Sequence, residues 1–481
     1  MSDNRTLFFI IGLLLASVAG GMLLPAMADA VSGHEDWQVF ITSALVTGFI
    51  AGALILTNRG DLPPLSVKQA FLLTSLSWLA LTGFAALPFA FSGMGLSYTD
   101  AFFEAMSGLT TTGATIITDL DNTPPGILLW RALLQWFGGI GIIVMAISVL
   151  PMLNVGGMQL FRLESSDTSE KILPRTAQIA GSITRLYFGI TLACVIAYAL
   201  AGMDIFDAVA HAMTTIATGG FSTRDDSLGA FAPSVATVAV IFMLLSAMPF
   251  VAYLQLVNRK FDKFMQDAQI RTFLILALVA SLAMWVYQLN IGIAEPAEAL
   301  LAAAFNTISI LTGTGYATTD YSEWGPFALA LFFVLTFIGG CAGSTACGLK
   351  IFRLQVIFKA GWRYIRQLTL PNGVFVIRYN GRVLSDEVAN SVVAFVLIFI
   401  LSFSVIAVSL SLMGLAPITA LSAAAAAIAN VGPGLGPDIG PTGTYAGLPD
   451  SAKWVLCFGM LLGRLEFLTV LVMFSPSFWR R

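Results

Sequence analysis

The sequence is poor in charge, because only 11% of its 481 residues are Asp, Glu, Lys or Arg. A soluble protein of this length needs far more charge to cover its surface, which excludes a soluble globular fold. With two histidines, four cysteines and no HExxH or CxxC spacing, a metal enzyme is not expected. The cysteines all lie in apolar stretches, so we interpret them as small buried hydrophobic residues: Cys194, Cys341, Cys347 and Cys457.

Apolar residues dominate instead, at 57% of the chain, and the mean hydropathy is +0.85. Apolar stretches of about 20 residues, long enough to cross a bilayer core of about 30 Å as helices, recur along the sequence. The first stretch is too long for a signal peptide and is followed at once by others, so we expect a retained helix. We predict an all-α membrane protein with ten transmembrane helices, at about 7–28, 39–57, 69–91, 126–150, 185–203, 231–257, 272–291, 326–349, 388–413 and 451–474.

Positive charge is confined to one side of the predicted membrane. Every Lys and Arg lies in a loop or terminus on that side except Arg131, Arg224, Lys453 and Arg464. Since basic loops stay in the cytoplasm, we expect this side and both termini to be cytoplasmic. The basic residues on it include Arg162, Lys171, Lys260 and Arg481.

Four shorter apolar segments, too short to cross, fall on the opposite, acidic side, at about 100–112, 207–219, 302–314 and 419–431. They align without gaps when each is anchored on one glycine, and an acid follows each glycine at five or six positions. Each segment also lies between two predicted spans, so the chain contains four repeats of a helix–pore-loop–helix unit. The four anchoring glycines, which we call the filter glycines, are Gly113, Gly220, Gly315 and Gly432.

This unit has a specific physical use. Non-helical backbone at membrane depth survives only where it is buried in protein or lines water. Glycine lets a carbonyl turn toward an axis, and the short helix points its partly negative C-terminal end the same way. Rings of carbonyls replace the hydration shell of a cation, so four loops in phase predict one cation pore. For one loop alone, packing of small residues between helices is the alternative, and the geometry does not separate potassium from sodium.

Six stretches carry a family resemblance: TTTGAT, ATGGFSTRDDS, TGTGYATTD, ANVGPGLGP, FIGGCAGSTACGLK (337–350) and GRLEFLTVLVMFSP (463–476). In these stretches the chain resembles the Trk/Ktr/HKT superfamily of potassium and sodium transporters, and the bacterial TrkH/TrkG type in particular. The resemblance runs from about residue 66 to the end, and the two preceding helices fit the N-terminal pair of the Trk branch. It implies pore repeats at 66–160, 161–262, 263–370 and 371–481, after an N-terminal helix pair at 1–65.

The resemblance also implies the ion-binding residues. A serine at the first filter position accompanies sodium selectivity in the superfamily, so glycine at all four positions favours potassium. Repeat four departs from the others because Pro433 follows its glycine, and we expect one irregular quadrant. The implied potassium-binding residues are Thr111, Thr112, Gly113, Thr218, Gly219, Gly220, Gly313, Thr314, Gly315, Asn430, Val431 and Gly432.

The eighth predicted helix contains four glycines, each of which costs about 1 kcal/mol relative to alanine in a helix interior. That favours local unwinding, although Gly339 and Gly343 also form a GxxxG packing motif. The resemblance implies an intramembrane gating loop beneath the filter here, including Gly339, Gly340, Gly343, Ser344 and Gly348.

Arg464 is the other singular residue, eleven positions before Ser475 in the last predicted helix. A straight helix places it roughly 16 Å above that end, too deep for snorkelling, so it should face water or a partner. We expect a positive charge beneath the filter that opposes cation passage in the closed state. A pair with Glu466 is disfavoured because residues two apart on a helix do not face each other.

The sequence therefore predicts gated, potassium-selective uptake, with a sodium- or proton-coupled potassium symporter as the alternative. Same-orientation repeats favour a pore over the inverted repeats of many coupled transporters. No nucleophile–base pair is apparent, so an enzyme is not expected. The resemblance implies the bacterial inner membrane, a homodimer with one pore per subunit, and a cytosolic TrkA-like nucleotide-binding regulatory ring. We expect no nucleic-acid partner and no bound cofactor besides the potassium ion.

Overall fold

The computed structural model describes residues 4–60, 62–148, 172–257, 259, 261–292 and 295–480. Within these ranges the chain is overwhelmingly helical, and its one sheet is a hairpin of β1 (Arg378–Tyr379) and β2 (Arg382–Val383). The two strands are antiparallel, with Arg378 opposite Val383. The predicted all-α class is confirmed for the described part of the chain.

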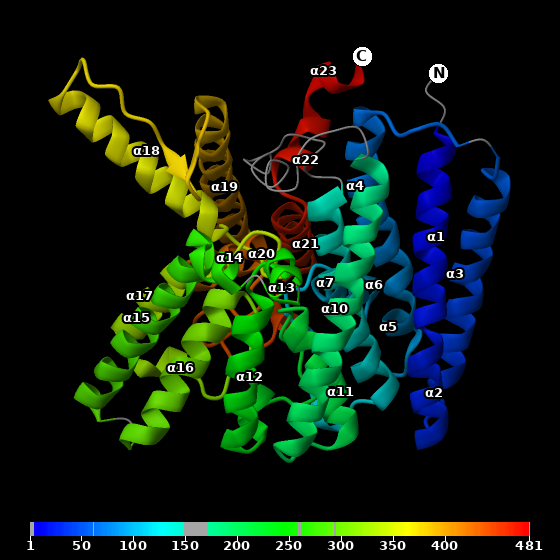
Figure 1. The fold of residues 1–481 in the computed structure, drawn as a ribbon. Coiled ribbons are helices and arrows are strands. Elements are labelled where there is room, and N and C mark those ends of the chain that lie inside the picture. The colour runs from blue at the N-terminus through cyan, green and yellow to red at the C-terminus, as the bar shows by residue number, and fades with distance from the viewer. Residues whose placement is uncertain are drawn as a thin grey trace.

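The N-terminal helices form one edge of the molecule (Figure 1). α1 (Arg5–Gly21) and α2 (Leu23–Ser32) run on as a single span, and α3 (Trp37–Thr57) packs along them. Gly12 permits the close approach, because a Cβ there would come within 2.9 Å of Ile55. The pair is therefore held by direct helix-to-helix packing.

The remaining helices are described in four consecutive groups. The first group contains α4 (Val67–Ala85), α5 (Leu87–Phe91), α6 (Tyr98–Leu109) and α7 (Pro125–Ser148). The second contains α10 (Ile172–Leu200), α11 (Ile205–Ile216), α12 (Pro233–Ser246), α13 (Phe250–Val257) and α14 (Phe261–Gln266). The third contains α15 (Ala268–Ile291), α16 (Pro296–Thr312), α17 (Pro326–Phe337) and α18 (Ile351–Thr369). The fourth contains α19 (Asp386–Leu412), α20 (Pro417–Ala429), α21 (Asp450–Arg464), α22 (Leu468–Leu471) and α23 (Pro476–Trp479).

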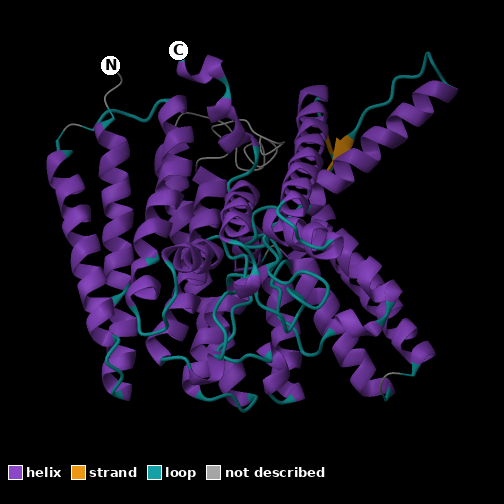
Figure 2. Cartoon of the chain, turned by 180° about the vertical axis from the view of Figure 1, so that it is seen from behind, coloured by secondary structure: helices purple, strands orange, loops and turns teal. Residues whose placement is uncertain are grey.

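Short 3₁₀ turns connect several of these helices on their loop side. They are η1 (Leu120–Asn122), η2 (Ser227–Ala230), η3 (Tyr321–Trp324), η4 (Tyr445–Gly447) and, near the C-terminus, η5 (Val472–Phe474). Seen from behind, the loops that follow the short helices gather in the middle of the molecule, between the long helices (Figure 2). This convergence brings the predicted pore loops together.

Seven helices in the described ranges are long and apolar enough to cross a membrane, and two strongly bent helix pairs raise the number to nine. The chain is thus a multi-span membrane protein, although three of the ten predicted spans are not continuous helices. The predicted span 231–257 bends by 93° between α12 and α13, where Pro249 interrupts the helix. The predicted span 451–474 bends by 109° after Arg464, where Glu466 has a φ of 60°.

The third correction concerns the predicted span 326–349, whose helix ends at Phe337. Residues 338–350, which we call the glycine-rich segment, are not helical, and α18 begins only at Ile351. Glycine allows this path because a Cβ at Gly339 would collide with the carbonyl of Cys347. Other expectations lie outside the described residues: the end of the span 126–150, the boundary at 160/161, and Arg162, Lys171, Lys260 and Arg481.

Three arginines are among the largest fully buried side chains: Arg131, Arg353 and Arg464. A charge in a low-dielectric interior is strongly unfavourable unless it is hydrogen-bonded or paired. The partners of these three arginines therefore locate the polar centre of the molecule.

Candidate functional site

All four short helices, α6, α11, α16 and α20, end in the same backbone motif. The first or second residue after each helix end adopts a left-handed conformation, with φ of 53° at Thr111, 51° at Thr218, 73° at Gly313 and 52° at Asn430. Its N–H bonds to the carbonyl three residues back, and the next N–H bonds to the carbonyl five residues before it. This is the Schellman arrangement, and it turns the chain out of the helix in the same direction four times.

The filter glycines come two residues later and are also left-handed, with φ between 75° and 100°. A Cβ on any of them would come closer than 3.0 Å to a carbonyl oxygen of the neighbouring loop. The contacted carbonyls follow one cyclic order: Gly113 meets Gly219, Gly220 meets Thr314, Gly315 meets Val431, and Gly432 meets Thr112. The four loops therefore close into one ring that contains all twelve predicted ion-binding residues.

Side-chain hydroxyl and amide groups of the loops also form hydrogen bonds with one another. The side-chain oxygens of Thr110 and Thr112 lie 2.8 Å apart, and those of Thr312 and Thr314 lie 2.8 Å apart. Asn430 Nδ2 donates to Thr112 Oγ1 at 2.9 Å, which joins repeat four to repeat one. The ring is thus closed by side chains as well as by backbone contact.

Repeat four is the irregular quadrant. Tyr445 donates its hydroxyl to the Gly432 carbonyl at 2.8 Å, so a side chain already occupies one lone pair of that oxygen. Pro433 Cδ lies 2.9 Å from where a Cβ on Gly315 would be. Both contacts distinguish this loop from the other three.

In three repeats, a polar side chain nine residues before the filter glycine forms a hydrogen bond with a residue two or three positions after that glycine. Glu104 accepts from Ile116 N at 2.8 Å, His211 Nε2 lies 2.9 Å from Ser222 Oγ, and Asn306 Nδ2 donates to Thr318 Oγ1 at 2.9 Å. Repeat four has Ala423 at this position, and Ser422 accepts from the Leu435 amide instead. The sequence analysis did not predict these loop contacts, although the three polar residues occupy the same position in the aligned repeats.

Two further residues, both on α7, were also missed. Arg131 pairs with Glu104 at 2.8 Å and donates to the Ser222 carbonyl at 2.7 Å, and Gln135 bonds the backbone on both sides of Gly220. Arg131 and Glu104 therefore form a fully buried ion pair. An arginine inside a predicted span was the signal that could have found this site.

The acids in the first turns of α6 and α11 form ion pairs. Asp100 lies in the first turn of α6 and pairs with Lys453 at 2.6 Å, and Asp207 in α11 pairs with Arg224 at 2.9 Å. The hydrogen bond from Arg224 to Asp207 raises the pKa of the guanidinium above its ordinary value. Both of these acids are therefore held in ion pairs.

The glycine-rich segment folds back on itself and packs into the break between α12 and α13. Ile338 and Leu349 form a parallel bridge, and the Cys341 N–H donates to Ala247 O at 2.9 Å. In return, the Phe250 N–H donates to Gly343 O at 2.9 Å. The break between α12 and α13 and the glycine-rich segment therefore form hydrogen bonds with each other's unpaired backbone groups.

The segment touches the inner side of the ring. Cys347 Sγ lies 4.0 Å from Thr111 Oγ1, and the Cys347 N lies 3.7 Å from where a Cβ on Gly313 would be. The predicted gate residues Gly339, Gly340, Gly343, Ser344 and Gly348 all belong to this folded segment. It lies against the ends of two loops rather than apart from them.

Arg464 holds the segment from the opposite side. Its side chain is 1% exposed and donates to Thr345 O at 3.2 Å, to Cys347 Sγ at 2.6 Å and to Gly138 O at 2.8 Å. The height derived from a straight helix was wrong, because α21 ends at Arg464 and the chain turns there.

Glu466, two residues beyond Arg464, pairs with Arg353 at 2.5 Å. Among the described residues, no carboxylate accepts a hydrogen bond from Arg464. Cys347, Arg353, Arg464 and Glu466 line a cavity of about 20 Å³ that adjoins the segment. That is room for about one water molecule.

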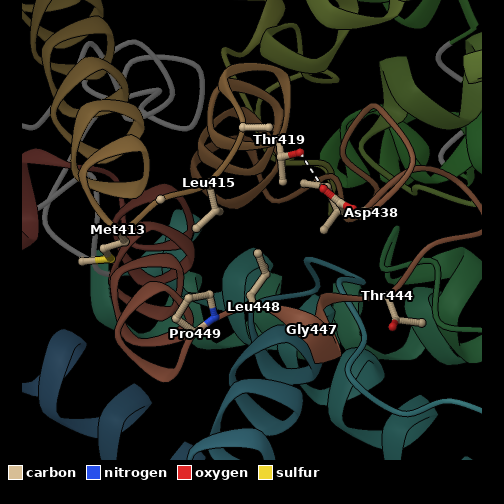
Figure 3. A pocket seen from close by; sticks show the side chains of 11 residues that line it. Met413, Leu415, Thr419, Asp438, Thr444, Gly447, Leu448 and Pro449 are labelled. Carbon is tan, nitrogen blue, oxygen red and sulfur yellow. Dashed lines mark hydrogen bonds between the residues drawn. The ribbon is translucent and has the colours of Figure 1, made fainter.

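A larger cavity, of about 450 Å³, is shown in Figure 3. It is formed by the α19–α20 connection and the loop before α21, and Thr419 donates to Asp438 across it at 3.0 Å. Its lining includes no residue of the ring or of the glycine-rich segment. In the described ranges, no cluster of three or more His, Cys, Asp or Glu side chains could hold a metal ion.

Comparison with known proteins identifies the family of the chain. The sequence model of the TrkH family, described as cation transport protein, matches residues 37–481. The chain is 47% identical over 466 residues to the Trk system potassium uptake protein TrkI of Halomonas elongata, covering 96% of this chain and 94% of that protein. It is 37% identical to the Trk system potassium uptake protein TrkH of Escherichia coli K12, with 99% of both chains covered.

A solved structure is also similar. The crystal structure of the potassium transporter TrkH from Vibrio parahaemolyticus matches with a TM-score of 0.92 and 36% identity, covering 99% of this chain and 100% of that one. The chain is thus a membrane cation transport protein and not an enzyme, as the sequence predicted. It belongs to the TrkH family.

Proposed function

We propose that the chain takes up potassium across the bacterial inner membrane through one central, gated pore. The observation that carries the proposal is the closed ring of four loops around the filter glycines. Such a ring offers carbonyl oxygens in place of the hydration shell of a cation. Potassium is the proposed cation because relatives covering nearly the whole chain are named potassium uptake proteins.

The proposed filter takes one loop from each of four pore repeats, at 66–160, 161–262, 263–370 and 371–481, with the helix pair 1–65 outside them. Potassium is the cargo, and its ligands come from the backbone of the twelve residues in the ring. The Schellman turns support this role, because they hold each loop in a conformation that needs no ion to form. A preorganised ring favours the cation whose size it fits.

The glycine-rich segment is the proposed gate. It lies against the end of the ring, and Arg464 donates hydrogen bonds to Thr345 O and Cys347 Sγ within it. A guanidinium without a carboxylate partner keeps a positive field at this point, which opposes the passage of a cation. Moving the segment away opens the path and withdraws the charge from it.

Control of this gate is proposed to come from outside the chain. α1 begins and α23 ends at the same end of the molecule, which supports cytoplasmic placement of both termini (Figure 1). The basic helix α18 reaches the same end of the molecule and carries Lys359, Arg363 and Arg366, and a TrkA-like nucleotide-binding ring is the proposed partner there. A homodimer with one pore per subunit is part of the same proposal.

Rubidium and sodium uptake into proteoliposomes of the purified protein tests the function. The membrane potential, the proton gradient and the sodium gradient are clamped in turn, with protein-free vesicles as the control. We expect passive, saturable rubidium entry that exceeds sodium entry. Strict dependence on a sodium or proton gradient would assign coupled symport instead, and equal entry of both cations would refute potassium selectivity.

A further inference from the structure

The side of α7 that faces the ring carries two polar residues one helical turn apart, Arg131 and Gln135. Residues four apart lie on the same helix face, so both reach the same neighbour. That neighbour is the filter loop of repeat two. Both side chains are buried, with exposed fractions of 1% and 0%.

Gln135 is fitted to the backbone of this loop by both ends of its amide. Nε2 donates to the Gly219 carbonyl at 2.7 Å, and Oε1 accepts from the Phe221 N–H at 3.0 Å. These two groups flank the filter glycine Gly220. A Cβ on Gly219 would come within 3.0 Å of the Gln135 amide, so this glycine makes room for it.

Arg131 supports the same stretch. Its guanidinium lies 4.1 Å from the centre of the Phe221 ring and donates to the Ser222 carbonyl at 2.7 Å. Backbone groups at 219, 221 and 222 are thus all held by one helix. Gly219 O is also the carbonyl that faces Gly113 in the neighbouring loop. The contacts of Arg131 and Gln135 therefore lie at the junction of repeats one and two.

The other junctions are built differently. Among the described residues, the corresponding carbonyls of Thr112, Thr314 and Val431 accept no hydrogen bond from a side chain. A carbonyl oxygen has two lone pairs, so Gly219 O can accept from Gln135 and still face a cation. The Gln135 amide therefore fixes the direction of one ring oxygen that would otherwise be free to tilt.

We propose that Gln135 is a positioning residue that sets cation selectivity by holding the Gly219 carbonyl in the ring. This inference rests on the proposed filter. Losing the amide lets the oxygen tilt and adapt to a smaller ion, so discrimination against sodium falls while the pore stays open. One hydrogen bond of ordinary strength corresponds to a change of roughly two- to tenfold in the rubidium-over-sodium uptake ratio.

Gln135→Met tests this inference in proteoliposomes, because methionine keeps the volume and loses both polar ends. We expect the rubidium-over-sodium uptake ratio to fall roughly two- to tenfold, with rubidium uptake itself retained. Gln288→Met is the matched control, since Gln288 is also buried, at 1% exposure, but lies on α15 away from the ring, and its ratio should equal that of the wild type. Gln135→Leu replaces the methionine variant if that protein does not reconstitute.

An unchanged or increased ratio in the Gln135 variant overturns the inference, because a space-filling role alone predicts that methionine is tolerated. Gly220→Ala in the same assay separates this failure from failure of the filter itself. If Gly220→Ala lowers the ratio and Gln135→Met does not, the ring stands and the role of Gln135 is refuted. If neither variant changes the ratio, the proposed filter is wrong as well.

Discussion

Replacing Arg464 with alanine should open the proposed gate. Two of its three hydrogen bonds go to the glycine-rich segment, to Thr345 O at 3.2 Å and Cys347 Sγ at 2.6 Å, while the third goes to Gly138 on α7. Hydrogen bonds from a charged donor contribute about 1.5–3 kcal/mol each, and less where sulfur is the acceptor. The closed arrangement should therefore lose about 2–4 kcal/mol, which increases the open population roughly 30-fold or more.

The assay is rubidium uptake into proteoliposomes that contain the purified chain and no cytosolic partner. We expect Arg464→Ala to raise this basal uptake at least about tenfold, allowing for incomplete reconstitution. Arg363→Ala is the control, because Arg363 makes a partly exposed pair with Asp386 on the surface. Uptake equal to or below that of the wild type, from a variant with the wild-type elution profile and thermal stability, would refute the barrier role.

Two further predictions concern the surroundings of the segment. Glu466→Gln leaves Arg353 buried without its anionic partner, so the free energy of unfolding should fall by about 3 kcal/mol; an unchanged thermal unfolding midpoint in detergent would contradict this. Gly339→Ala should raise basal rubidium uptake, because its Cβ would collide with the carbonyl of Cys347. Gly361→Ala, in α18 with nothing near its Cβ position, should leave uptake unchanged, and equal uptake by both variants would argue against the packing role of Gly339.

The loops could be predicted from the sequence because their determinants are local. A glycine at the same place in four aligned segments marks a backbone that needs left-handed φ, and all four filter glycines have it. Thr111, Thr218 and Asn430, two positions earlier, also have a left-handed φ. The two threonines could not be predicted to do so, because threonine rarely takes that conformation. There the helix-ending hydrogen bonds override the preference of the residue.

The contacts between repeats could not be predicted in the same way. Gln135 meets Gly219 across 84 positions, and Arg353 meets Glu466 across 113. No local pattern records such pairs. Hydropathy also reports only that a stretch is apolar, so it joined helices that turn by 93° at Pro249 and by 109° after Arg464 into straight spans.

The central claim, that the ring of four loops is a potassium filter, is tested most directly by the rubidium-over-sodium uptake ratio of Gly315→Ala. Its Cβ would collide with the carbonyl of Val431 in the ring, whereas Gly292→Ala has the same kind of positive φ, 66°, with nothing within 4 Å. Both variants carry similar backbone strain, so they differ in the ring contact alone. We expect the ratio to fall toward one in Gly315→Ala and to stay at the wild-type value in Gly292→Ala. A wild-type ratio in a folded, transporting Gly315→Ala protein would contradict it.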